Sequence, residues 1–150
     1  MRRPNVVFVF GDQWRAQATG YAGNPTVQTP NLDRLAGRCV NFGLAVSGFP
    51  VCSPYRASLL TGAYERTHGF TFGTQPLAVD FTDQSYPTLL REVGYQSGFV
   101  GKFGVRTEEG ETDTMFDTYV PLRPAPYIKQ LEDGSARHLT DITADESIEY

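Results

Sequence analysis

Four residues of types that can do chemistry lie at the ends of predicted elements: Asp12, Cys52, Arg56 and Lys102. A helix that begins beside Cys52 would attract an anion through its unpaired N–H groups. Arg56 and Lys102 would add positive charge, and the Asp12 carboxylate is a ligand that a hard metal ion prefers. A nucleophile, an anion-binding surface and a cation together suit the transfer of a tetrahedral oxyanion such as sulfate or phosphate.

Alternating strand and helix patterns must position these residues. Continuous apolar runs predict strands over residues 5–10, 39–46 and 95–104. Stretches with a proline near the start and a glycine near the end predict helices over residues 29–38, 53–62 and 85–94. This alternation predicts an α/β fold with a mostly parallel sheet flanked by helices.

The predicted topology brings the candidate residues towards one edge of the sheet. Asp12 follows the first strand, Cys52 lies just before a helix N-terminus, and Lys102 follows a later strand. In open α/β sheets the site lies beyond the carboxyl ends of the strands, so these side chains are expected to share one crevice. Each residue also has a purely structural interpretation, as a core cysteine, a solvated basic side chain or a loop-capping aspartate. The spacing alone leaves both interpretations open.

Length and composition limit the class of protein. The 150 residues, 40% of them hydrophobic, are enough for one domain with a core. The net charge of −4 comes with no basic stripe, which argues against nucleic acid as a partner, and no stretch is long enough to span a membrane. Two cysteines are too few for a disulfide scaffold, although one bridge stays open, and Cys39 is expected in the core. The start shows no export signal, which predicts a cytoplasmic protein, or a periplasmic or secreted one if the true start lies upstream.

The pattern weakens after the third predicted strand. Residues 105–114 predict a charged loop, residues 120–127 a proline-rich extended stretch, and residues 138–150 a helix with Thr140 as its N-cap. That helix has no closing signal before the chain stops. We therefore expect residues 1–150 to be the N-terminal part of a single domain, truncated within a helix.

The segment CSPYRASLLTG resembles the signature of the type I sulfatases, Cys-x-Pro-Ser-Arg-x-x-x-Leu-Thr-Gly or close to it. The matching positions are Cys52, Pro54, Arg56, Leu60, Thr61 and Gly62. PNVVFVFGDQWRA resembles the family's first strand with its metal-binding aspartate, TPNLDRLAGRCVNF its next helix and strand, and GYQSGFVGKFG its lysine-bearing strand. DITADESIEY resembles a later helix. The resemblance covers nearly the whole chain and implies the N-terminal part of an alkaline-phosphatase-like α/β catalytic domain.

The resemblance also implies a specific chemistry. A formylglycine-generating enzyme oxidises Cys52 to formylglycine, and the hydrated aldehyde is held by a divalent metal, usually Ca2+, with Mg2+ or Mn2+ as alternatives. One hydroxyl of the hydrate attacks the sulfur of a sulfate monoester, and the other then releases sulfate. Carried over by position, Asp12 is a metal ligand, Arg56 stabilises the hydrated aldehyde, and Lys102 contacts the sulfate oxygens.

Three positions depart from the family pattern. Tyr55 replaces the usual serine of the signature, although Cys-x-Pro-x-Arg is intact. Gln13 stands where many members carry a second aspartate, so one metal charge is absent or an amide oxygen supplies the ligand. Gly104 replaces the histidine found two places after the lysine, and His68 is not assigned to that role.

Sulfate ester hydrolysis, on a small-molecule or saccharide substrate, is the first functional hypothesis. The second is hydrolysis of phosphonate monoesters or phosphodiesters, because related enzymes share a DQWR start and a non-serine signature; Lys102 favours the sulfatase. The family's further metal ligands and its general-acid histidine lie beyond these residues. The chain alone is therefore expected to be inactive, either as a fragment of a longer enzyme or as an inactive remnant.

Overall fold

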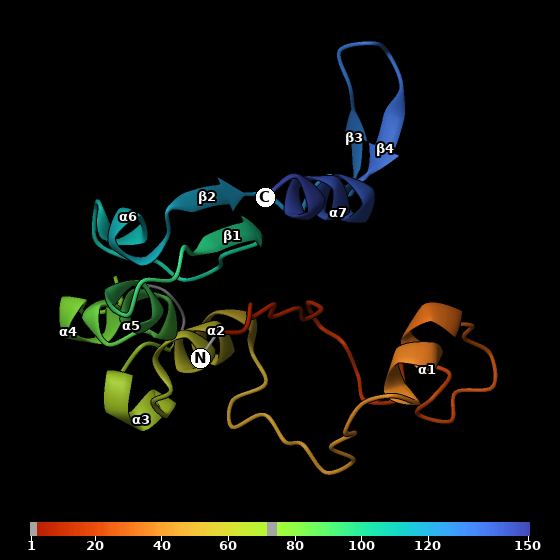
Figure 1. Cartoon of the computed structure of the whole chain (residues 1–150), viewed down its shortest axis with the longest axis horizontal. Coiled ribbons are helices and arrows are strands. Elements are labelled where there is room, and N and C mark those ends of the chain that lie inside the picture. Colours follow the sequence, from red (N-terminus) through yellow and green to blue (C-terminus); the bar gives the residue numbers. More distant parts are fainter. Residues whose placement is uncertain (1–2, 72–74) are drawn as a thin grey trace. The chain divides into compact units, whose positions relative to one another are not determined.

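A computed structural model describes residues 3–71 and 75–150, and the chain forms two compact units, residues 1–46 and residues 47–150. Figure 1 shows the elements of both units in chain order. No helix in the described part of the chain combines the length and the apolar character that a membrane crossing requires.

The first unit contains one helix, α1 (Pro30–Ala36), among its described residues. Thr29 precedes the helix and Pro30 occupies its first turn, as the sequence predicts. The Thr29 hydroxyl donates to Asp33 Oδ1 (2.7 Å) and accepts from the Gly20 N–H (2.8 Å). Asp33 Oδ1 also accepts from the Tyr21 N–H (2.8 Å). These bonds join the start of α1 to the loop that precedes it.

Two strands predicted in this unit, residues 5–10 and 39–46, are wrong: both segments are irregular. Val7 is 84% exposed and Leu44 is 95% exposed. A strand exists only where a neighbour completes its hydrogen-bond ladder, and among the described residues no strand pairs with either segment. Cys39, predicted in the core, is exposed for the same reason, and both cysteines are free thiols.

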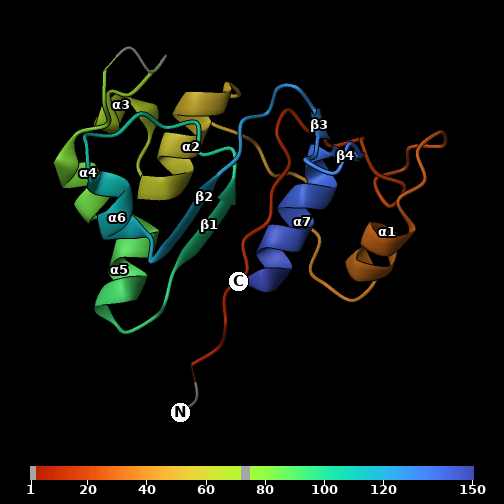
Figure 2. The same cartoon turned by 90° about the horizontal axis from the view of Figure 1, so that it is seen from above.

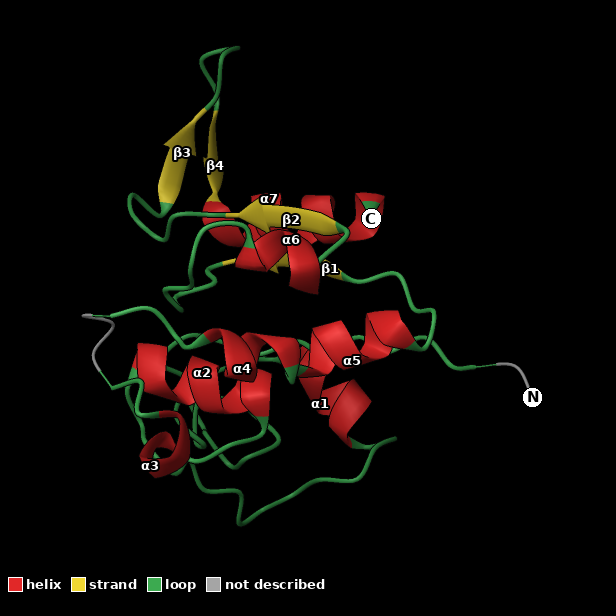
Figure 3. Ribbon diagram, turned by 90° about the vertical axis from the view of Figure 1, so that its left-hand side faces the viewer, coloured by secondary structure: helices red, strands yellow, loops and turns green. Residues whose placement is uncertain are grey.

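The second unit carries the remaining elements, and Figure 3 shows helices in red and strands in yellow. Its helices are α2 (Cys52–Thr61), α3 (Glu65–His68), α4 (Val79–Asp83), α5 (Tyr86–Glu92), α6 (Glu111–Met115) and α7 (Leu139–Glu149). Its strands are β1 (Gly98–Gly101), β2 (Thr118–Pro121), β3 (Ile128–Gln130) and β4 (Ala136–His138). The predicted helices over residues 53–62 and 85–94 and the strand within 95–104 are confirmed.

The sheet of this unit has the parallel pairing that the sequence predicts. β1 and β2 pair in parallel, with Gly98 opposite Thr118 and Gly101 opposite Pro121, and α6 lies in the connection between them. β3 and β4 form a separate antiparallel hairpin that the sequence pattern did not indicate. Figure 2 shows α7 on the other side of the β1–β2 pair from α2, α4 and α5. Helices therefore flank both faces of the parallel pair, which confirms the α/β class.

Close packing holds α7 against β1. A Cβ atom on Gly98 would lie 2.6 Å from the Tyr150 ring, so only glycine allows this approach. The core on the other side consists of Ala57, Leu60, Phe70, Leu77, Val105, Met115 and Phe116. The apolar residues of α2 thus pack inward and hold that helix in the unit.

Three local predictions are corrected by the structure. α2 begins at Cys52, with Val51 as its N-cap, so Cys52 is the first helical residue and does not precede the helix. The segment 105–114 is not a loop throughout, because α6 begins within it. The N-cap of α7 is His138, whose Nδ1 accepts from the Thr140 N–H (3.1 Å), and Thr140 lies inside the helix.

A partly buried hydrogen-bond chain ties α2 to α3. His68 Nδ1 accepts from the Phe70 N–H (3.0 Å), so in the neutral ring the proton is on Nε2. Nε2 lies 3.0 Å from Ser58 Oγ, and this hydroxyl donates to Glu65 Oε1 (3.1 Å). Burial lowers the pKa of His68, an effect that the nearby Glu65 carboxylate opposes. The fold therefore requires the neutral imidazole, because a protonated ring could not accept from Phe70.

The His68 bonds predict that stability falls as the protein is acidified. The folded pKa lies below the ordinary value of 6.5, so the contribution is complete above that pH and is lost as the pH falls towards the folded pKa. Thermal unfolding from about pH 7.5 to about pH 5.5 should show a falling Tm that His68→Gln largely removes. His138→Gln, at the other histidine, should keep the wild-type decline. Equal pH dependence in wild type and His68→Gln would contradict this interpretation.

The core predicts a second stability effect. Leu77 is completely buried, and its N–H donates to the Arg106 carbonyl (2.8 Å). Leu77→Ala leaves that backbone bond possible but opens a cavity, so it should lower the free energy of unfolding by about 2–5 kcal/mol. Leu89→Ala is the matched control, since Leu89 is 47% exposed and should cost about 1 kcal/mol or less. Urea unfolding measures both; similar costs at the two sites would show that Leu77 is not a core residue.

Candidate functional site

Helix α2 presents two of the predicted site residues one turn apart. Cys52 is exposed at its first position, where the backbone N–H groups have no partner within the helix. Arg56 follows four residues later and is only 7% exposed. Residues at this spacing lie on the same side of a helix. The helix ends at Thr61 and is capped by Gly62, whose φ of 69° lies in the left-handed region that favours glycine.

Lys102 enters the same region from the end of β1. It follows Gly101, the last residue of that strand, and its carbonyl accepts a hydrogen bond from Arg56 Nη1. This bond joins residues 46 positions apart in the chain. The C-terminal end of β1 and the first turns of α2 are thereby held together, as the predicted topology requires.

The loop after Lys102 accommodates both basic side chains. Gly104 has a φ of 70°, and a Cβ atom there would lie 2.9 Å from Arg56 Cδ and 3.6 Å from Lys102 Cε. Two cationic side chains from α2 and from the end of β1 therefore lie against the backbone of Gly104. Such a pair can bind two oxygens of a tetrahedral anion.

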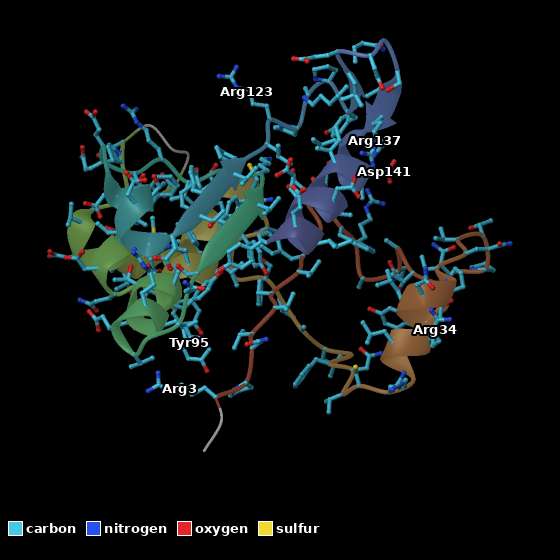
Figure 4. The ribbon with its side chains drawn as sticks, turned by 45° about the horizontal axis from the view of Figure 1, so that its top comes forward. Arg3, Arg34, Tyr95, Arg123, Arg137 and Asp141 are labelled. Carbon is cyan, nitrogen blue, oxygen red and sulfur yellow. The ribbon has the colours of Figure 1, made fainter. Side chains whose placement is uncertain are left out.

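Two further basic side chains of this unit, Arg91 and Arg137, form ion pairs with carboxylates. Arg137, labelled beside α7 in Figure 4, forms an ion pair with Asp145 (Nη1–Oδ2, 2.6 Å). Arg91 pairs with Asp117 (Nη2–Oδ1, 2.8 Å), and the Ser97 N–H and Arg91 together lower the pKa of that carboxyl group. These groups stabilise the fold and give no reason to place an anion there.

Asp12 and Gln13 lie in the first unit, within a tight turn. Gln13 has a φ of 42°, in the left-handed region that non-glycine residues rarely adopt. The Trp14 indole lies over Gly11, so closely that a Cβ atom on Gly11 would collide with the ring. Backbone in this region is costly for a side-chain-bearing residue, and such positions concentrate at functional sites.

Of the five predicted site residues, the structure joins Arg56 and Lys102 by a hydrogen bond, and Cys52 lies one turn before Arg56 on α2. Asp12 and Gln13 offer a carboxylate and an amide oxygen, the donor types that Ca2+ takes, in a set of six to eight oxygens. Within residues 3–71 and 75–150, no group of three or more His, Cys, Asp or Glu side chains could hold a metal ion. The donors present fit the metal in type, and a complete site requires further oxygen ligands.

Sequence reasoning missed two features of this region. The first is the structural role of His68, which supports α2 through its contact with Ser58. Gly104 was read only as a missing histidine, whereas its backbone lies against Arg56 and Lys102. No sequence signal indicates which side chain fills the space beside a glycine, because that depends on long-range packing.

Comparison with known proteins is consistent with this geometry. Residues 4–150 match the protein family described as Sulfatase. An ulvan-active sulfatase from Formosa agariphila is 45% identical over 67% of the chain, and the multifunctional alkaline phosphatase superfamily protein PehA from Trinickia caryophylli is 38% identical over 67%. The chain spans 19% and 20% of the lengths of these two proteins.

A solved structure extends the match to almost all of the chain. The structure of BT4656 in complex with its substrate D-glucosamine-2-N,6-O-disulfate superimposes with a TM-score of 0.81 at 29% identity. The superposition covers 99% of this chain and 31% of the BT4656 chain. The alkaline-phosphatase-like α/β fold inferred from the sequence is thereby confirmed, and the chain belongs to the sulfatase family.

Proposed function

We propose that residues 1–150 are the N-terminal part of a sulfatase catalytic domain that hydrolyses a sulfate monoester through formylglycine derived from Cys52. The observation that carries this proposal is the approach of Arg56 and Lys102 to one another beside the helix that begins at Cys52. The short span of the chain relative to its relatives supports the assignment to part of a longer domain. The intact Cys-x-Pro-x-Arg motif supports the modification.

The basic residues of the site would bind and polarise the transferred group. Lys102 supplies a flexible ammonium to the sulfate oxygens. Arg56, which is expected to stabilise the hydrated aldehyde, supplies beside it a planar guanidinium that the Lys102 carbonyl already orients. Positive charge held in place before reaction stabilises the negative charge that develops on those oxygens. One hydroxyl of the hydrated formylglycine would attack sulfur and displace the alcohol as the S–O ester bond breaks, and the second hydroxyl would lose its proton as sulfate leaves and the aldehyde is restored.

A divalent cation, Ca2+ or alternatively Mg2+ or Mn2+, would be held by Asp12, by Gln13 through its amide oxygen, by residue 52 and by ligands from the rest of the domain. Bound there, it would act as a Lewis acid and neutralise charge on oxygen. Because Gln13 is uncharged, the site would carry one negative charge fewer than one with two aspartates at these positions.

A saccharide sulfate is the substrate class with most support. One relative is named for activity on ulvan, and the BT4656 structure contains a glucosamine disulfate. A formylglycine-generating enzyme would be the partner that modifies Cys52. The resemblance to PehA keeps phosphonate monoester or phosphodiester hydrolysis as the second candidate.

The modification can be tested on the 150-residue chain, since it acts on the sequence motif. After co-expression with a formylglycine-generating enzyme, the tryptic peptide from Cys39 to Arg56 should contain an aldehyde at residue 52 that hydroxylamine captures. Cys39, in the same peptide, should remain a thiol and serves as an internal control. Tyr55→Ser, which restores the usual signature, should be converted to a similar extent.

The outcome of that measurement separates an enzyme from an inactive remnant. An unmodified Cys52 in wild type, with conversion in Tyr55→Ser, would mean that Tyr55 blocks recognition. The formylglycine mechanism would then fail for this chain, and an inactive remnant would be the better interpretation.

The anion-binding role predicts a distinct effect for each of the chain's two lysines. In the full-length protein that contains this chain, Lys102→Ala should lower kcat/KM for an aryl sulfate by about 100-fold or more. The substitution keeps the backbone carbonyl that orients Arg56. Lys129→Ala, on the β3–β4 hairpin, removes an exposed bond to the Arg123 carbonyl and should leave activity unchanged.

Matched substrates distinguish the two candidate reactions. A higher kcat/KM for the aryl sulfate than for the corresponding phosphonate monoester supports the sulfatase, and the reverse order supports the second candidate. Equal activity of Lys102→Ala and Lys129→Ala would contradict the role of Lys102 in binding the sulfate oxygens.

A further inference from the structure

The space beside Gly104 is already occupied by Arg56. A Cβ atom on residue 104 would lie 2.9 Å from Arg56 Cδ and 3.4 Å from Arg56 Nε, and carbon atoms in proteins do not approach to the first of these distances. Either the loop or the arginine would have to move to admit any side chain.

The loop cannot easily move, because one neighbour of Gly104 lies in the core and the other packs against it. Val105 is 7% exposed and is part of the core. The Phe103 ring packs edge-on against Phe99 (5.2 Å between centroids) and Phe116 (5.9 Å). Displacing residue 104 would pull these side chains out of their contacts.

The arginine is held as well. Its guanidinium donates to the Lys102 carbonyl, and the residue is only 7% exposed, so the clash falls on the middle of a fixed side chain. Helix α2 cannot shift to relieve it, because Ala57, the next residue, is completely buried and Leu60 is 5% exposed. A side chain at residue 104 would therefore displace the Arg56 guanidinium from Lys102.

We propose that Gly104 is a positioning residue for Arg56: the absence of a side chain there allows the arginine stem to lie across the loop and the guanidinium to stay beside Lys102. This inference rests on the proposed function for its catalytic consequence.

Gly110 provides a matched control for the test. It also has a positive φ, of 85°, but a Cβ atom there would meet nothing within 4 Å. Gly104→Ala and Gly110→Ala therefore share the backbone strain of alanine in the left-handed region, and only the first disturbs Arg56.

The experiment measures the inhibition constant of inorganic sulfate, together with kcat and KM, in the full-length protein. Gly104→Ala should raise the inhibition constant and KM by about tenfold or more, because a charge-assisted contact to the anion is displaced, and Gly110→Ala should leave both near wild type. Gly104→His should behave at least as badly as Gly104→Ala. A merely structural role would lower the active fraction, and so kcat, without changing the inhibition constant.

A thermal-unfolding cycle tests the contact without relying on activity. If the clash is with Arg56, Gly104→Ala should lower Tm more in the wild-type background than in the Arg56→Ala background. In the Arg56→Ala background, the fall in Tm caused by Gly104→Ala should be no larger than that caused by Gly110→Ala. Equal costs in both backgrounds, an unchanged sulfate inhibition constant, or higher activity in Gly104→His would overturn the inference. Absence of sulfatase activity in the wild type, with the unfolding cycle as expected, would refute the proposed function and leave the positioning of Arg56 by Gly104 intact.

Discussion

The hydrogen bond from Arg56 to the Lys102 carbonyl is the constraint around which this part of the fold is arranged. It joins the first turns of α2 to the end of β1, and it uses a backbone acceptor, so the Lys102 ammonium takes no part in it. A buried guanidinium is costly unless it is hydrogen-bonded, so the Lys102 carbonyl must be held where Arg56 can reach it. The packing of Phe103 and Val105 provides that fixed position, because it holds the backbone on both sides of Gly104.

The aromatic cluster behind the loop connects local packing with the site. Phe99 from β1, Phe116 before β2 and Tyr119 from β2 surround Phe103, with ring centroids 5.2–5.9 Å apart. Parallel pairing of β1 with β2 brings these rings together, and burial raises the pKa of the Tyr119 hydroxyl. Apolar contacts set the register of the two strands, and that register fixes the position of Lys102 at the end of β1. A rigid scaffold commonly positions charged loop residues in this way.

The sequence predicted most of what depends on local signals. Helices with a proline in the first turn and a glycine at the end were found near their true limits, and β1 was identified from its apolar residues. Predictions failed where the outcome depends on distant partners: residues 5–10 have the composition of a buried strand but no neighbour in the described chain. The His138 cap and the α3 turn were missed because a histidine acceptor and a four-residue helix leave weak signals.

The site shows the same division between local and long-range information. The residue types of Cys52, Arg56 and Lys102 indicate the chemistry. The close approach of the Arg56 and Lys102 side chains, however, depends on the backbone of the loop against which both lie. A single positive charge in a cleft would attract any anion, whereas two that are held by a helix and a strand end fix the separation of the oxygens they can bind. Gly104 matters because the absence of a side chain there leaves room for the Arg56 stem beside Lys102. A substitution on the supporting backbone is therefore expected to alter anion affinity as strongly as the loss of one contact to the anion itself.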